Sequence, residues 1–404
     1  MRELLVRNRD FRRLFLASVV SLAGDWFSFV AVASLVTQLT GRAGAAAYVY
    51  AATVLPVFLA SPIAGAIADR FDRRRILVIA DLLRVPVALL MCVAAWQGSA
   101  ALAIAAVVAL AVGASFSDPI ASAATPNLVP PEHLASAQSL MGAVWGSMLM
   151  VGAGLGGIVA ELFGRNAAFV LDAASFLISG WLIAGIRRPM QQERSPGHAH
   201  GSIREALTYI RGRRIVLRLL FAKTGVSSAN GIVGLLPAFA TRRFAGTDVA
   251  TGLLFAARGL GAMLGPILAR SIVGATPVRR AIILVCGIST LTYCVFYAAF
   301  PPVAALGTFS LAALLVVLAH LGGGAQWSMS TYGLQHETPD QFRGRVMSLD
   351  YGLATLWIGV SSIAAGLLAD AYGEASATWW LAAIGATYAV AWLIWSLTGL
   401  HRRA

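Results

Sequence analysis

Two long apolar segments of this chain are joined by Gly65-Ala-Ile-Ala-Asp69-Arg70-Phe-Asp72-Arg73-Arg74-Arg75. Arginine side chains are excluded from the hydrocarbon of a bilayer, so this hairpin is expected at a membrane surface. Short loops rich in Lys and Arg stay on the cytoplasmic side, which places the hairpin inside the cell. Asp69 stands out, because a loop that only resists translocation needs no acid. We expect another part of the protein to hold and release it.

The composition is that of a membrane protein. The chain has 404 residues, of which 58% are hydrophobic and 12% are charged, and its mean hydropathy is +0.75. A soluble domain carries about 25% charged residues, so an ordinary globular fold is excluded. Apolar runs of about 20 residues, each long enough for a membrane-spanning helix, recur from end to end. The twelve predicted spans are 13–39, 45–68, 76–97, 99–122, 134–161, 166–186, 214–240, 247–270, 279–300, 302–325, 344–370 and 377–399.

The charge of +13 is distributed by topology. With both termini inside, 24 of the 31 basic residues fall in cytoplasmic segments, and only Arg42, Arg165, Arg242 and Arg243 fall outside. This bias predicts an even number of spans, both ends in the cytoplasm, and a multi-pass protein of the cytoplasmic (inner) membrane. The lipid bilayer explains the basic charge, and nucleic acid is not an expected partner.

The chain divides into two related halves. The longest polar interval predicts a cytoplasmic linker over 187–213, between a six-helix bundle over 1–186 and another over 214–404. At a constant offset of 209, Pro130, Ser139, Leu140, Val151, Gly157, Ala160 and Gly164 match Pro339, Ser348, Leu349, Val360, Gly366, Ala369 and Gly373. Matches at corresponding span boundaries indicate a duplicated unit. Repeat-built transporters bind their substrates near the membrane midplane.

The sequence predicts neither a cofactor nor a metal site. The three cysteines lie in apolar spans without paired spacing. Lys223 is the only lysine, and it lacks the glycine spacing of a phosphate-binding loop. ATP is therefore not an expected energy source, so any coupling comes from an ion gradient or from none, and a proton gradient is the driving force that we expect. The only close histidine pair lies in the linker, so an enzyme is not expected.

The hairpin resembles the best-known motif of the major facilitator superfamily. The residues that fit are Gly65, Asp69, Arg70, Arg73 and Arg74. Asp72 stands where the family usually has a second glycine. The resemblance, which covers essentially the whole chain, implies an all-α integral membrane fold with two six-helix bundles related by pseudo-twofold symmetry. It also implies a small-molecule transporter that functions as a monomer.

A second motif indicates an exporter. The end of the fifth span, Gly152-Ala-Gly154-Leu-Gly156-Gly157, resembles the antiporter motif of drug exporters, which usually has proline where Ala153 stands. Further segments are similar to the branch of enterobactin exporters and macrolide efflux proteins. These segments are Asn8-x-Asp10-Phe11-Arg12-Arg13-Leu14-Phe15, Gly24-Asp25, and Asp172-Ala-Ala-Ser175-Phe176.

The resemblance implies a conformational switch at Asp69. In the family this aspartate lies near the start of span eleven in the outward-facing state. A carboxylate at a helix N-terminus is stabilised by about 0.3–2 kcal/mol, which biases two states of similar energy without locking either. The alternative is a purely topogenic charge cluster.

Six ionisable residues within the spans are candidates for binding protons or substrate. They are Asp25, Arg84, Asp118, Asp172, Lys223 and Arg258. Charges at membrane depth usually face a cavity or a partner. Asp25 is preferred as the proton site, because Gly24, Ser21 and Ser28 suggest a packed or hydrated face. The alternative for Asp25 and for Asp172 is a hydrogen bond that joins two helices.

The partners of the buried cations are open at this point. Asp81 and Arg84 are three residues apart and should meet on one helix face. The alternative is that Arg84 stands in for an arginine that antiporters of the resembled family carry in span four, with Asp118 as a further candidate partner. Lys223 and Arg258 either attract an anionic substrate or pair with Asp25 or Asp172.

We therefore predict a secondary transporter that exports small amphipathic compounds, drug-like or siderophore-like, by proton antiport and alternating access. The alternatives are a gradient-independent facilitator, an importer or a lipid transporter on the same fold. A membrane-embedded sensor or enzyme is less favoured.

Overall fold

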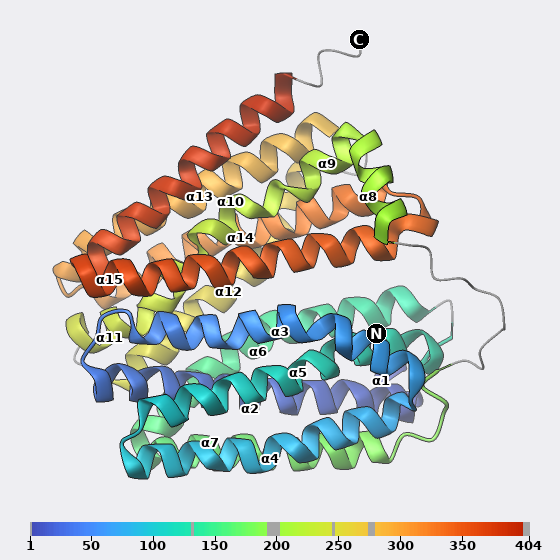
Figure 1. Ribbon diagram of the computed structural model, residues 1–404, viewed down its shortest axis with the longest axis horizontal. Coiled ribbons are helices and arrows are strands. Elements are labelled where there is room, and N and C mark those ends of the chain that lie inside the picture. The colour runs from blue at the N-terminus through green and yellow to red at the C-terminus, as the bar shows by residue number, and fades with distance from the viewer. Residues whose placement is uncertain (1, 131–132, 192–202, 245–246, 274–278, 399–404) are drawn as a thin grey trace. The chain divides into compact units, whose positions relative to one another are not determined.

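The computed structural model describes residues 2–130, 133–191, 203–244, 247–273 and 279–398 (Figure 1). All regular structure in these ranges is helical. By their contacts the residues form two compact units, one of Met1–Arg194 with Leu236–Ala256 and one of Ser195–Leu235 with Ala257–Ala404.

The first unit contains the helices that carry the acidic candidates. They are α1 (Arg2–Arg7), α2 (Arg9–Thr40), α3 (Ala45–Arg70), α4 (Arg73–Gln97), α5 (Ala100–Leu128), α6 (Leu134–Phe163), α7 (Arg165–Ala184), α11 (Leu236–Arg243) and the first part of α12 (Asp248–Val273). Helix α2 packs against α6 and α7, and α4 packs against α5 and α7. Side chains of α2, α4 and α7 therefore meet inside this unit.

The second unit is built around α13 and the long α15. Its elements are α8 (Ile203–Gly212), α9 (Arg214–Leu220), α10 (Ala222–Ala229), the 3-10 helix η2 (Asn230–Leu235), the rest of α12, α13 (Arg279–Ala305), α14 (Phe309–Glu337) and α15 (Asp340–Thr398). Helix α13 packs on α14 and α15, while α10 packs on α15. Helix α8 lies within the interval 187–213 that the sequence predicted as a linker.

The helices account for the predicted spans. Ten helices among the described residues are long and apolar enough to cross a membrane, and Ala45–Ala60 is a shorter apolar helix. One of the ten, in α15, contains two predicted spans, which separate where the backbone leaves the helical region at Gly373 (φ 84°, ψ 161°). Gly164 has nearly the same conformation (φ 81°, ψ 156°) between α6 and α7. Positive φ favours glycine, and the match at an offset of 209 supports the internal repeat.

The predicted boundary between spans nine and ten is wrong. Helix α13 continues through Pro301 and Pro302 to Ala305, and α14 begins only at Phe309. A proline removes the N–H that would bond to the carbonyl four residues earlier. For Pro302 that carbonyl belongs to Ala298, and the indole Nε1 of Trp379 donates to it instead at 2.9 Å. A side chain from another helix thus stabilises the turn.

The second unit is discontinuous in sequence, because it consists of Ser195–Leu235 and Ala257–Ala404. Residues 236–256 belong by their contacts to the first unit, because α11 packs against α2 and α3. The boundaries of folding domains remain a prediction.

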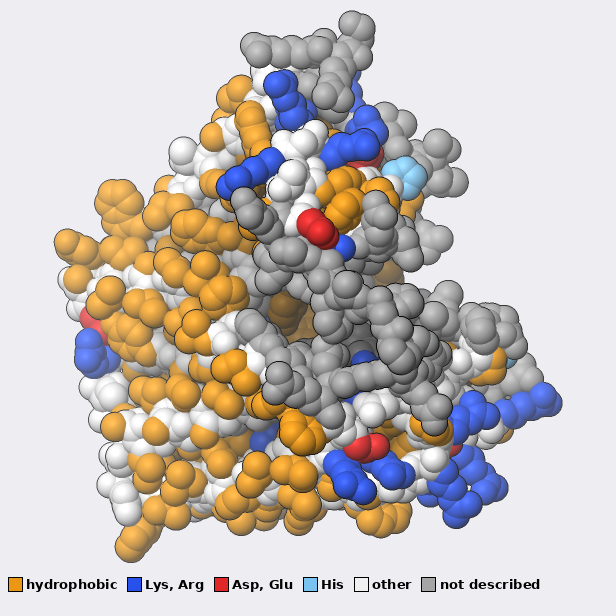
Figure 2. Space-filling view, turned by 45° about the vertical axis from the view of Figure 1, so that its right-hand side comes forward, with side chains coloured by type: hydrophobic (Ala, Val, Ile, Leu, Met, Phe, Trp, Pro, Cys, Tyr) orange, Lys and Arg blue, Asp and Glu red, His pale blue; other side chains and the backbone are white. Residues whose placement is uncertain are grey.

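The surface agrees with a lipid environment. Figure 2 shows hydrophobic side chains over much of the left side of the view, while most of the visible Lys and Arg side chains form groups toward the right and the top. Large apolar side chains such as Leu83, Trp181 and Val295 are at least 60% exposed, a pattern that suits contact with acyl chains.

Candidate functional site

A buried arginine lies among three carboxylates in the first unit. Arg84 on α4 donates a hydrogen bond to Asp25 on α2. Its Nη1 atom lies 3.8 Å from Oδ1 of Asp81, which is one turn away on the same helix. Its guanidinium also experiences the charge of Asp172 on α7. We call Asp25, Asp81, Arg84 and Asp172 the Arg84 cluster. The expected contact between Asp81 and Arg84 is present.

Small and aromatic neighbours hold Arg84 in place. A Cβ on Gly113 of α5 would lie 2.7 Å from Cγ of Arg84, so only glycine admits the side chain there. The guanidinium carbon lies 3.9 Å from the ring centre of Phe176, a cation–π contact. Ser21 accepts a weaker hydrogen bond from Arg84 at 3.4 Å. The arginine is thus fixed between helices that only tertiary packing brings together.

Asp172 is the most deeply buried acid of the cluster, and the hydroxyls of Ser28 and Ser175 lie beside its carboxyl group. Its side chain is fully buried, and neither carboxylate oxygen has a hydrogen-bond partner among the described residues. The nearby hydroxyl of Ser175 donates to the backbone carbonyl of Asp172 at 2.7 Å, and that of Ser28 donates to Met91 Sδ. A Cβ on Gly24 would lie 2.7 Å from Asp172 Oδ1, so α2 covers the carboxyl group closely. Asp25, in contrast, has 31% of its side chain exposed.

Lys223 has a partner in its own unit. Its ammonium on α10 is paired with Asp350 on α15, and it donates to Thr331 Oγ1 at 2.9 Å. The ring of Trp327 on α14 covers the ammonium at 4.7 Å. Asp350 is thus a partner of Lys223 that the alternatives drawn from the sequence did not include.

Arg258 is buried on α12, near His320 on α14. The Nε2 atom of His320 shares a hydrogen bond of 2.9 Å with the hydroxyl of Tyr297, and its ring packs edge-on against Tyr293. Aromatic rings therefore surround this histidine, and one of its ring nitrogens has a hydrogen-bond partner.

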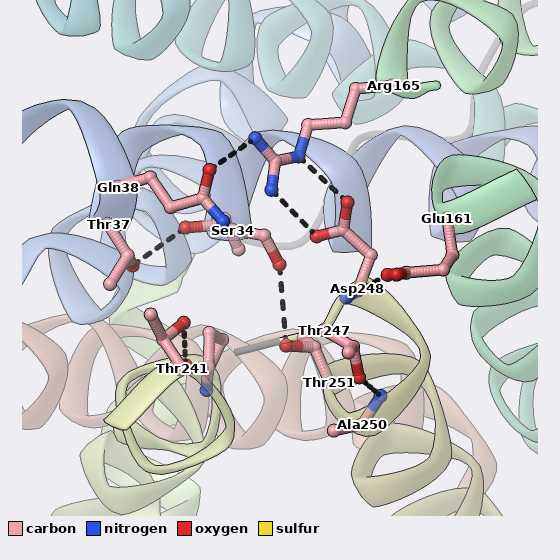
Figure 3. Close-up of polar contacts among 12 residues, drawn as sticks. Ser34, Thr37, Gln38, Glu161, Arg165, Thr241, Thr247, Asp248, Ala250 and Thr251 are labelled. Carbon is pink, nitrogen blue, oxygen red and sulfur yellow. Dashed lines mark hydrogen bonds and ion pairs between the residues drawn. The ribbon is translucent and has the colours of Figure 1, made fainter. Parts of the chain in front are cut away.

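A second polar network joins α2, α6, α7 and α12 within the first unit (Figure 3). Arg165 bonds to both carboxylate oxygens of Asp248, at 2.9 and 3.2 Å, and to Gln38 Oε1 at 2.9 Å. The carboxylate of Glu161 accepts from the backbone N–H of Asp248 at 3.0 Å. We call Gln38, Glu161, Arg165 and Asp248 the Arg165 network.

The glycines of α6 allow the close packing beside this network. A Cβ on Gly156 would lie 2.7 Å from Cα of Phe27 on α2, and one on Gly152 would lie 3.2 Å from Cβ of Trp26. On the neighbouring face, a Cβ on Gly157 would lie 2.6 Å from the carbonyl oxygen of Asp248. The antiporter-like glycines thus form contact surfaces for α2 and α12.

Two arginines at the start of α4 bond to the segment that follows α7. Arg74 donates to the carbonyl of Ile186 at 2.8 Å, and Arg73 donates to that of Met190 at 3.2 Å. Cations at carbonyl-rich helix ends are stabilising. Asp72, which departs from the family pattern, is the N-cap of α4 and accepts from the N–H of Arg75 at 2.9 Å.

Several predicted residues lie outside the part of the chain whose side chains are described. They are Gly65, Asp69, Arg70 and Asp118. The arrangement of the Asp69 switch and the pairing of Asp118 therefore stay predictions. Within the described residues, no group of three or more His, Cys, Asp or Glu could hold a metal ion.

Sequence reasoning did not identify Asp350 and Asp248 as ion-pair partners. Both are acids near the start of an apolar run, a signal shared with many topological charges. Only the rotation of each helix about its axis reveals that Asp350 and Asp248 point inward.

Comparisons with known proteins agree with this architecture. The family model described as "transmembrane secretion effector" matches residues 5–402. The chain is 30% identical over 379 residues to the multidrug efflux pump Tap of Mycolicibacterium fortuitum, covering 89% of each protein. It is 22% identical over 370 residues to macrolide efflux protein A of Streptococcus pyogenes, covering 90% of each. With the uncharacterized MFS-type transporter YkuC of Bacillus subtilis it is 26% identical over 247 residues, which span 58% of this chain and only 57% of that relative's length.

Solved structures show the same fold at low identity. A POT family transporter in complex with 5-aminolevulinic acid has a TM-score of 0.76 at 12% identity, covering 97% of this chain and 96% of that one. The nucleoside transporter NupG has a TM-score of 0.70 at 12% identity, covering 96% and 98%. At such identity the likeness establishes the fold alone.

Proposed function

Since the chain belongs to the transmembrane secretion effector family of major facilitator transporters, we propose that it exports small amphipathic compounds by proton antiport. The names of two relatives, a multidrug efflux pump and a macrolide efflux protein, support a drug-like substrate. The protein resides in the cytoplasmic membrane with both termini inside, as the distribution of arginines favours.

The observation that carries this proposal is the imbalance of charge in the Arg84 cluster. One arginine faces three carboxylates, so the fully ionised cluster would hold two negative charges in excess. An uncompensated charge inside a membrane protein is strongly unfavourable. Proton binding removes the excess, and the cluster is therefore suited to take up and release protons during a cycle.

Asp172 is the residue we assign to the proton. Arg84 donates to Asp25 and lies beside Asp81, whereas the oxygens of Asp172 have no hydrogen-bond partner among the described residues. A proton that arrives from outside forms an O–H bond on Asp172, and this bond breaks when the proton leaves toward the cytoplasm. Asp25, the first choice from the sequence, is better suited to a cationic group of the substrate, because it is partly exposed.

Access alternates when the Arg165 network opens and closes. The network joins helices from both sequence halves, and its arginine is one of the four predicted outside. Its closure blocks the outer route while the substrate loads from the cytoplasm. The Asp69 hairpin performs the corresponding task on the inner side.

Transport in proteoliposomes tests the proposal. Full-length protein is reconstituted, and efflux of ethidium, a fluorescent amphipathic cation, is followed with and without an imposed pH gradient. We expect the gradient to drive uphill movement in the wild type. Asp172→Asn should abolish this response but retain exchange of ethidium across the membrane, because exchange needs no proton.

The matched control is Glu205→Gln. This substitution removes an exposed carboxylate, which pairs with Arg345. It should transport like the wild type. Gradient-insensitive transport by the wild type would contradict antiport and favour a facilitator.

A further inference from the structure

The buried ion pair of the second unit is not used by the mechanism above. Lys223 and Asp350 are each less than 4% exposed. A buried pair stabilises a fold poorly compared with apolar residues of similar size. Inside a membrane such a pair is best explained by a function.

The choice of lysine at this position is informative. All 30 other basic residues of the chain are arginines, so this is the one cation with an ammonium group. A guanidinium holds a carboxylate through two parallel hydrogen bonds and keeps it ionised, whereas an ammonium is a rotatable point charge. Asp350 is therefore held less firmly than an arginine would hold it.

The surroundings of Lys223 compensate its charge when Asp350 becomes neutral. Thr331 on α14 accepts a hydrogen bond from the ammonium at 2.9 Å, and the face of Trp327 attracts it at 4.7 Å. The second oxygen of Asp350 has no hydrogen-bond partner among the described residues and is free to take a proton.

Few other groups that face the pair can be charged or titrate. Helix α13 contributes the thiol of Cys286, whose Sγ lies 3.9 Å from the carbonyl of Gln326. Helix α15 contributes Tyr388, whose hydroxyl donates to the carbonyl of Phe221 at 2.8 Å. Helix α14 contributes only neutral groups, so the net charge of this site is set by Lys223 and Asp350.

Two aromatic rings with exposed surface lie beside the pair. Trp327 is partly exposed, and Tyr351, next to Asp350 in the chain, has 52% of its surface exposed. The two rings meet edge to face with centroids 6.4 Å apart. The pair is therefore one aromatic layer away from an accessible surface.

From these contacts we propose that Asp350, positioned by Lys223, is a second proton-binding site of the transport cycle. A proton adds to the free oxygen of Asp350 and forms an O–H bond. The ion pair with Lys223 breaks, and Lys223 keeps its own proton while Thr331 and Trp327 stabilise the ammonium. The inference rests on the proposed proton antiport and adds a second carrier in a different unit from Asp172.

Infrared difference spectroscopy of the purified full-length protein tests the proposal without a substrate. Protonated carboxyl groups absorb separately from carboxylates, so a pH titration reports each one. We expect Asp350→Asn to remove one titrating carboxyl band. Lys223→Arg should make the same group bind its proton about tenfold more weakly, because the arginine fork holds the carboxylate.

The variants distinguish this inference from the proposed function. Asp172→Asn should remove a different band, and its failure to do so would count against the proton site of the Arg84 cluster only. If Asp350→Asn removes no titrating band, the second site is refuted while proton antiport stands. Lys223→Arg retains both the positive charge and the ion pair, so it tests the proposal even if Asp350→Asn fails to fold. An unaltered titration in Lys223→Arg would refute the second proton site.

Discussion

Arg165 on α7 bonds to Asp248 on α12 through two parallel hydrogen bonds, with Nε 2.9 Å from Oδ2 and Nη2 3.2 Å from Oδ1. The residues are 83 positions apart and come from different sequence halves. Beneath them Ser34 of α2 donates to Thr251 of α12 at 3.3 Å. The paired arrangement fixes the end of α2 and the start of α12 together, so opening here must break charge-assisted bonds.

Arg165→Gln should therefore increase access to the layer below. A partly exposed ion pair contributes about 1 kcal/mol, which is about fivefold in a two-state population. The measurement is labelling of a Ser34→Cys variant by a membrane-impermeant maleimide added outside. We expect about fivefold faster labelling with Arg165→Gln.

The control for that experiment is Arg9→Gln, which removes an exposed arginine from the opposite end of α2. It should leave the labelling rate unchanged. Equal rates in the Arg165→Gln and control proteins would show that the ion pair does not restrict opening.

Substitutions of Asp72, the N-cap of α4, should destabilise the protein to different degrees. Its side chain accepts from the N–H of Arg75, and loss of such a cap costs about 1 kcal/mol for alanine but a few tenths for glycine. Asp72→Ala should lower the melting temperature in detergent clearly. Asp72→Gly, the family's usual residue, and Asp72→Asn should lower it much less. Equal melting temperatures for the alanine and asparagine variants would contradict the capping role.

The sequence predicted those structural features that depend on residues close together in the chain. Apolar length locates a span, and the repeat predicted that Gly164 and Gly373 would be equivalent, which their matching backbone angles support. The contact of Asp81 with Arg84 follows from helical spacing alone.

Pairings between distant helices could not be predicted in this way. The partner of Lys223 is 127 positions away, and its selection depends on how α10 and α15 are rotated and packed. The extension of α13 through Pro302 depends on Trp379, which belongs to another helix. Both contacts join helices that are distant in the sequence, and no local sequence pattern encodes them.

Helices α6 and α12 cross closely at Gly157, so we expect a larger residue at this position to impair transport. An alanine Cβ there would meet the carbonyl oxygen of Asp248 at 2.6 Å and Cα of Gly252 at 3.1 Å. The helices must move apart, and overpacking of this kind typically costs about 1–3 kcal/mol. We expect Gly157→Ala to lower the efflux rate markedly, with expression retained, in the ethidium assay.

Gly154→Ala is the matched control on the same helix. Its Cβ would lie 3.6 Å from that of Ala256, an ordinary contact. Transport should stay close to the wild-type rate. Equal losses in both variants would indicate a general intolerance of α6 rather than the proposed close approach.

Arg84 should be the most sensitive position in the first unit. Its removal leaves three carboxylates, two of them buried, without a cation, and loss of one partner from a buried pair costs about 3–5 kcal/mol. Arg84→Gln should strongly lower the melting temperature. Because the folded variant must bind protons that the unfolded chain does not, its stability should fall as pH rises from about 5 to about 8.

The double variant Arg84→Gln with Asp25→Asn separates charge from packing. It returns the excess of negative charge to that of the wild type, although Gln cannot replace the stacking on Phe176. We expect it to melt at a higher temperature than Arg84→Gln alone and to depend less on pH. If the second substitution only adds to the destabilisation, the arginine acts through packing, and the charge imbalance that supports a proton site at Asp172 loses its physical basis.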